Sequence, residues 1–106
     1  SNRQQKAYIG IQKLQQSYVA DTILEELSAA TTKLTETEQQ VKTARENMAL
    51  AEENLDLVTF SYNEGKASMV DVLSAQLSWT QAQTNLINAH LAAKMAVAEY
   101  RKAISE

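Results

Sequence analysis

The chain of 106 residues contains no proline, no cysteine and only two glycines. Proline and glycine interrupt helices, so their scarcity favours long uninterrupted helices. Helix formers such as alanine, leucine, glutamine and glutamate are abundant instead, and the sequence predicts a single all-α domain. The lack of cysteine excludes a disulfide framework, which fits a reducing cytosol and a disulfide-free periplasm equally.

The residue sets that carry catalysis or bind cofactors are also lacking. There is no cysteine nucleophile, Ser/His/Asp set or phosphate-binding loop, so we expect neither enzymatic activity nor a cofactor. His90, the only histidine, has no Cys, Asp or Glu at ligand spacing, and the glutamates lack the Glu-x-x-His pattern of di-iron bundles. We therefore expect no metal site. The net charge of -3 provides no basic surface for nucleic acid.

The chain begins Ser1-Asn2-Arg3, without an initiating methionine or a signal peptide. This start is typical of a segment excised from a larger protein, with residues 1–2 as a remnant of a cloning vector. The longest uncharged run, Val72 to Ala93, is not a membrane span because polar side chains interrupt it repeatedly.

One strong turn divides the sequence, and it contains Gly65. The pattern predicts a long antiparallel α-helical hairpin, with helix one over residues 4–63, a turn over 64–68 and helix two over 69–105. Gly65 suits the left-handed position that follows a helix, and Ser68 suits the N-cap of the next one. Asp71, three residues after Ser68, completes a pattern close to a capping box and favours the positive end of the helix dipole.

Apolar and small residues recur every seven positions in both helices, which predicts a coiled-coil seam. In helix one the two series are Leu27, Leu34, Val41, Met48, Leu55 and Tyr62, and Ala30, Thr37, Ala44, Ala51 and Val58. In helix two they are Val72, Trp79, Leu86, Ala93 and Tyr100, and Ala75, Ala82, Ala89, Ala96 and Ala103. Large residues facing alanines predict closely packed antiparallel helices.

Helix two carries a second apolar row, centred about 150° from the seam. This outer row consists of Leu73, Leu77, Thr80, Thr84, Ile87, Leu91 and Ala98. A helix with two nearly opposed apolar faces is expected to have neighbours on both sides. Neutral polar residues lie between the two faces: Gln76, Ser78, Gln81, Gln83, Asn85 and Asn88. They fit either an ordinary exposed surface or the lining of a water-filled passage.

The first 22 residues follow a different phase from the rest of helix one. Ala7, Ile11, Leu14 and Tyr18 form a helical stripe out of register with the Leu27 series. Either the helix continues through a stutter, which we favour, or this end bends away and a new helix starts near Thr22. Helix one is also longer than helix two, so about 20 residues lack a partner helix. We expect the isolated chain to self-associate through its exposed apolar rows.

The order of motifs resembles the TolC-type outer-membrane efflux proteins. The resemblance lies in Ala51-x-x-Asn54-Leu55, then Tyr62-x-x-Gly65, then Asp71-Val72-Leu73-x-Ala75-Gln76, with alanines every seven residues. It extends over residues 34–104, and the Val-Asp-Val-Leu motif is more similar to the second of the family's two repeats. It implies a homotrimer in the Gram-negative outer membrane, whose helical tunnel crosses the periplasm, and this chain would be one tunnel hairpin.

The resemblance also implies partners and site residues. Family hairpins end at the periplasmic mouth, where their tips meet a periplasmic adaptor protein that connects to an inner-membrane pump. The docking tip would comprise Asn63, Glu64, Gly65, Lys66, Ala67 and Ser68. Tyr62 and Asp71 match positions that constrict the closed mouth in some relatives. Ala67 and Ser74 replace charged residues of such relatives, which argues against a charge-locked gate.

Two other classes remain open from the sequence. A structural coiled-coil hairpin of a periplasmic adaptor protein would explain the heptads and the tip, but not the outer row of helix two. A helical-bundle sensor domain would need a pocket between helices, whereas five alanines in register favour a closed seam.

Overall fold

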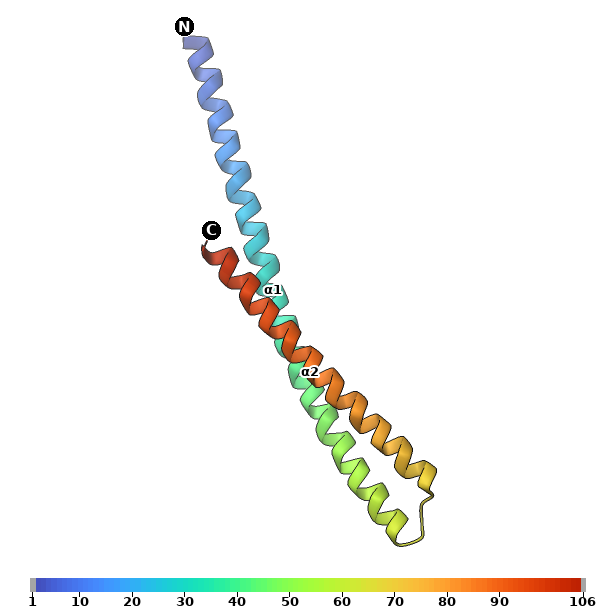
Figure 1. The fold of residues 1–106 in the computed structure, drawn as a ribbon. Coiled ribbons are helices and arrows are strands. Elements are labelled where there is room, and N and C mark those ends of the chain that lie inside the picture. Colours follow the sequence, from blue (N-terminus) through green and yellow to red (C-terminus); the bar gives the residue numbers. More distant parts are fainter. Residues whose placement is uncertain (1, 106) are drawn as a thin grey trace.

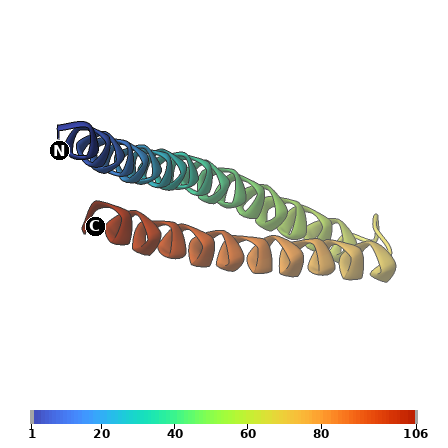
Figure 2. The ribbon, with the colours of Figure 1, turned by 90° about the horizontal axis from the view of Figure 1, so that it is seen from above.

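A computed structural model describes residues 2–105 and contains two helices. Helix α1 spans Asn2–Asn63 and helix α2 spans Met69–Ser105. They run antiparallel in an elongated hairpin of 95 × 19 × 13 Å (Figures 1 and 2). The expected all-α hairpin is confirmed, and α1 begins two residues earlier than predicted. Ser1, half of the expected vector remnant, lies outside the described residues.

The contact between the two helices is made largely by small side chains. The buried residues are Ala30, Thr37 and Ala44 of α1, and Val72, Ala75, Ala82 and Ala96 of α2. The larger seam residues flank them half-buried: Leu34, Val41, Met48, Leu55, Trp79, Leu86 and Tyr100, together with the smaller Ala89. Because small residues occupy the centre, the two helices approach closely and the larger side chains cover the sides of the contact.

Thr37 is the one polar side chain among these buried residues, with an exposed fraction of 1%. Its Oγ1 donates to the carbonyl oxygen of Lys33 at 2.8 Å and lies 3.1 Å from that of Leu34. The hydroxyl is therefore satisfied inside its own helix and needs no partner from α2.

We expect Thr37→Val to change the free energy of unfolding by less than about 0.5 kcal/mol. Valine keeps the shape, and the hydroxyl contacts carbonyls that are already bonded within the helix. Thr37→Ala, which also removes the buried methyl group, is expected to cost about 1 kcal/mol. Urea titrations monitored by circular dichroism compare the two variants, and an equal loss in both would show that the hydroxyl itself stabilises the seam.

Helix α1 continues without a break through the region where the apolar phase changes. Thr22, the alternative helix start, instead donates its hydroxyl to the Tyr18 carbonyl oxygen at 2.9 Å, one turn back in the same helix. This bond is typical of a helix interior rather than of an N-cap. The preferred interpretation of one continuous helix is therefore confirmed.

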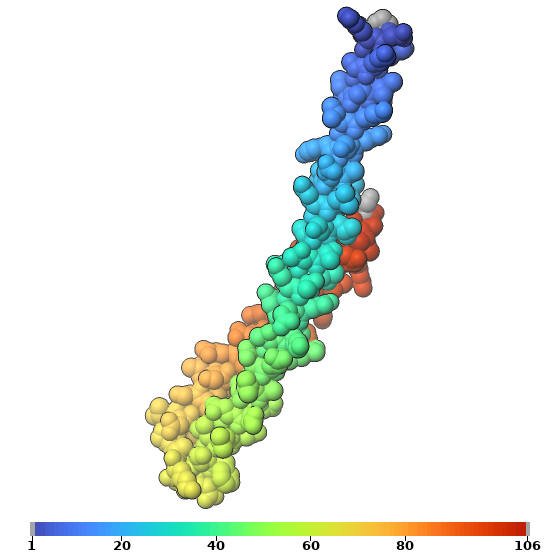
Figure 3. Space-filling model, turned by 180° about the vertical axis from the view of Figure 1, so that it is seen from behind, coloured from blue at the N-terminus to red at the C-terminus, as the bar shows by residue number. Residues whose placement is uncertain are grey.

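The N-terminal part of α1 projects beyond the end of α2 as a single helix (Figure 3). We call residues 2–25 the overhang. Every residue in it except Thr22 is exposed, including Ile11, Leu14 and Tyr18 with exposed fractions of 54%, 71% and 73%. The described part of α2 leaves this apolar surface uncovered.

The outer row of α2 is likewise exposed. Leu73, Leu77, Ile87 and Leu91 have exposed fractions of 53%, 60%, 61% and 57%. The hairpin thus buries one apolar face of α2 against α1 and leaves the opposite one bare. Across residues 2–105, neither helix has an apolar stretch long enough to span a bilayer.

Candidate functional site at the hairpin tip

Helix α1 ends in a Schellman motif that reverses the chain direction. The Lys66 amide donates to the Ser61 carbonyl oxygen at 2.8 Å, and the Gly65 amide donates to that of Tyr62 at 3.0 Å. Gly65 has a φ of 76°, which is the left-handed region that favours glycine. A Cβ at Gly65 would meet nothing within 4 Å. The requirement for glycine here therefore comes from the backbone conformation and not from lack of space.

Helix α2 begins with a reciprocal capping box. The Asp71 amide donates to Ser68 Oγ at 3.2 Å, and the Ser68 amide donates to Asp71 Oδ2 at 2.9 Å. Two amides at the start of the helix are satisfied in this way. The bond from the Ser68 backbone, followed by that from its side chain, lowers the pKa of Asp71 below its usual value of 3.8.

We expect the stabilising effect of the Asp71 carboxylate to depend on pH. Because the folded state lowers its pKa, the contribution is present above the unfolded value near 3.8 and is lost as the pH falls through the lower folded value. Asp71→Asn should therefore be less stable than wild type at pH 6, and the difference should shrink as the pH falls below 3.8. Thermal unfolding at pH 6 and pH 2 measures this, and an undiminished difference at pH 2 would contradict it.

The residues predicted for docking form the end of the rod. Asn63, Glu64, Gly65, Lys66 and Ser68 are exposed, whereas Ala67 is half-buried. Two rigid caps hold this short connection, since the Schellman motif closes one side and the capping box closes the other. A partner would therefore meet a preformed surface, which reduces the entropy lost on binding.

Apolar side chains beside the turn belong to the same end of the molecule and were not among the predicted tip residues. Phe60, Met69 and Val70 have exposed fractions of 63%, 50% and 70%. Their exposure can be predicted from the sequence, because Phe60, Met69 and Val70 lie outside both heptad series and close to Gly65. Exposed apolar residues around a polar turn are typical of a protein-binding surface.

A groove between α1 and α2 runs next to the turn. Its lining residues are Asn54, Leu57, Val58, Ser61, Lys66, Ala67, Asp71, Ser74, Ala75 and Ser78. Asp71 lines this groove, but Tyr62 does not, and Tyr62 has an exposed fraction of 43%. Tyr62 continues the Leu27 series in sequence, yet it lies in the last turn of α1 and is exposed there. The groove thus contains only one of the two proposed mouth residues.

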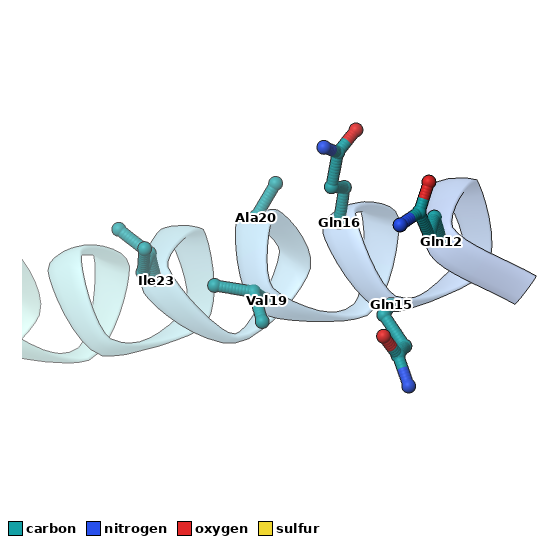
Figure 4. A pocket seen from close by; sticks show the side chains of 6 residues that line it. All are labelled: Gln12, Gln15, Gln16, Val19, Ala20 and Ile23. Carbon is teal, nitrogen blue, oxygen red and sulfur yellow. The ribbon is translucent and has the colours of Figure 1, made fainter. Parts of the chain in front are cut away.

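Elsewhere along residues 2–105, the surface hollows are open to solvent. Gln12, Gln15, Gln16, Val19, Ala20 and Ile23 surround one of them, and all six belong to α1 (Figure 4). Their side chains point away from the helix in several directions. In the described part of the chain, no group of three or more His, Cys, Asp or Glu residues is placed to hold a metal ion.

Comparison of the chain with protein-family models, with curated proteins and with solved structures gives no match.

Proposed function

We propose that this hairpin is part of the periplasmic tunnel wall of a trimeric, TolC-type outer-membrane efflux channel, and that its tip docks a periplasmic adaptor protein. The channel would export drugs or other toxic compounds, or serve type I secretion, together with an inner-membrane pump. The observation that carries the proposal is the bare outer row of α2, opposite the buried seam.

The outer row supports a wall of several helices rather than a free-standing hairpin. Leu73, Leu77, Ile87 and Leu91 are each more than half exposed, and they follow one face of α2 over about five turns. A contiguous apolar face of this length is costly in water and is typical of an interface. In a closed ring of hairpins, α1 covers one face of α2 and the neighbouring hairpin covers the other.

The neutral polar strips of α2 fit the same arrangement. Gln76, Gln81, Gln83, Asn85 and Asn88 are all exposed and lie between the two apolar faces. A helix with neighbours on two sides has two remaining faces, one toward the lumen and one toward the periplasm. Amide side chains can line a wet passage without holding charged cargo by ion pairing.

The tip supports docking because it combines a rigid turn with exposed apolar residues. Phe60, Met69 and Val70 supply apolar contact area around the polar turn, and Lys66 supplies a positive charge at the end of the rod. Protein interfaces combine apolar contact area with polar groups in this way. A charge-locked gate is not part of this proposal, since Oδ2 of Asp71 already accepts the Ser68 amide.

Cysteine crosslinking in the full-length protein tests the proposal directly. The 106 residues contain no cysteine, so a single introduced thiol is unique in this part of the protein. Lys66→Cys at the tip should crosslink through a short thiol-to-amine reagent to the adaptor encoded with the channel. Lys42→Cys, exposed on the middle of α1, is the matched control and should not crosslink to it.

Two results would contradict the proposal. One is the absence of an adaptor product from both variants in cells that carry out efflux. The other is a gene that lacks flanking amphipathic β-strands and a second copy of the hairpin motif, which would favour an adaptor hairpin or a sensor bundle instead.

A further inference from the structure

The overhang carries opposite charges at its two ends. Its basic residues, Arg3, Lys6 and Lys13, all lie in the first half, and its acidic residues, Asp21 and Glu25, lie in the second. All five side chains are exposed. A helix with this distribution attracts a second helix of the same sequence only when the two run antiparallel, because a parallel pair would place like charges side by side.

The exposed apolar stripe of the overhang has the matching symmetry. Ala7, Ile11, Leu14 and Tyr18 lie on one face, and Leu14 is near the middle of residues 2–25. With about 100° per residue, Arg3 and Asp21 fall on one flank of this stripe, and Glu25 falls within the stripe, in line with Ala7. When two identical helices pair about a twofold axis, equivalent flanks face each other, so these charges are brought to the same side.

We infer that the overhang pairs antiparallel with the overhang of a second copy of this chain. In one register, Leu14 faces Leu14 of the second copy across the twofold axis and Ile11 faces Tyr18 of the second copy. The same register places Arg3 beside Glu25 of the second copy and Lys6 beside Asp21 of the second copy. In an antiparallel pair, residues at the same height along the axis have residue numbers with a constant sum. The sums for these four pairs are between about 27 and 29, so a single register fits all four pairs within about 3 Å along the helix axis.

The proposed dimer is weak and depends on concentration. The paired segments are about 35 Å long, which is between about three and four heptads. Isolated helices and helix pairs of this length are marginal in water. The inferred dimer is independent of the channel proposal. It requires only that the overhang be exposed, so it does not form where other parts of a larger protein cover the overhang.

Sedimentation equilibrium of the chain tests the inferred contact. Wild type should show a reversible monomer–dimer equilibrium, and Leu14→Lys should weaken it at least about a hundredfold, because two leucines are lost and two like charges meet at the axis. Leu50→Lys, on an exposed position of α1 within the hairpin, is the matched control and should leave the equilibrium unchanged. Leu14 lies outside the seam, so circular dichroism should show the hairpin intact in both variants.

Charge reversal tests the register. Arg3→Glu and Glu25→Arg should each weaken dimerisation about fivefold at low salt, since every dimer contains two such pairs. The double variant, Arg3→Glu with Glu25→Arg, should recover the wild-type affinity. An equimolar mixture of the two single variants should also form heterodimers in preference to homodimers.

Disulfide formation tests the orientation. Leu14→Cys should form a disulfide between two copies on mild oxidation, because the two sulfur atoms meet near the axis. Gln4→Cys should not, since an antiparallel pair separates the two introduced thiols by about 30 Å. A chain that stays monomeric at millimolar concentration, a dimer abolished by Leu50→Lys, or an efficient Gln4→Cys disulfide would each overturn the inference.

Discussion

Ala96→Leu is expected to lower the free energy of unfolding of the hairpin by about 2 kcal/mol. Ala96 has an exposed fraction of 1% and belongs to the buried alanines of α2 that face α1. A leucine in this position has no space unless the helices separate, and overpacking of such sites typically costs about 1–3 kcal/mol. Separation would also expose neighbouring seam residues, because the contact has no second layer behind it.

Ala98→Leu is the matched control for this prediction. Ala98 lies two residues further along the same helix and is exposed, so the added leucine should leave stability within about 0.5 kcal/mol of wild type. Thermal unfolding followed by circular dichroism compares the three proteins, and Ala96→Leu should melt about 10 °C lower. Equal melting temperatures for both variants would show that the helices are not held in close contact at the alanines.

The second large effect concerns the two glycines, which should respond in opposite directions. Gly65→Val should destabilise the hairpin by about 1–2 kcal/mol, because a β-branched residue is strained at a φ of 76°. Gly10→Ala should instead raise the helix content of the overhang and stabilise it by about 1 kcal/mol. Gly10 lies inside α1, and a Cβ there would meet nothing within 4 Å.

Far-ultraviolet circular dichroism and urea unfolding measure both glycine variants. The informative result is the difference in sign, since a general intolerance of substitution would lower stability in both. A stable Gly65→Val protein would mean that the chain can turn without the Schellman motif. In the proposed channel, Gly65→Val should also reduce efflux, because the tip surface depends on this turn.

Much of the architecture follows from local sequence features. The absence of proline and the heptad series predict the two helices and the face on which each contacts the other. Gly65, Ser68 and Asp71 predict the turn, and the structure forms both expected caps with direct hydrogen bonds. These features are accessible from sequence because helix capping involves residues only a few positions apart.

Local sequence features predict only part of the candidate site. The turn residues were predicted, but the exposed apolar residues Phe60, Met69 and Val70 were not. Tyr62 fits the heptad series and is nevertheless exposed. Whether a residue in a heptad series is covered depends on how the partner helix packs beside it, and that is a property of two different segments of the chain.

By itself, the sequence determined an all-helical chain, one turn, and two opposed apolar faces on α2. Only the tertiary structure decided which of those faces α1 covers and how far the cover extends. Helix periodicity sets the direction of a side chain, but burial requires a second segment at the same height along the axis. The overhang remains exposed because α1 is longer than α2, and the outer row remains exposed because the two helices meet along a single seam.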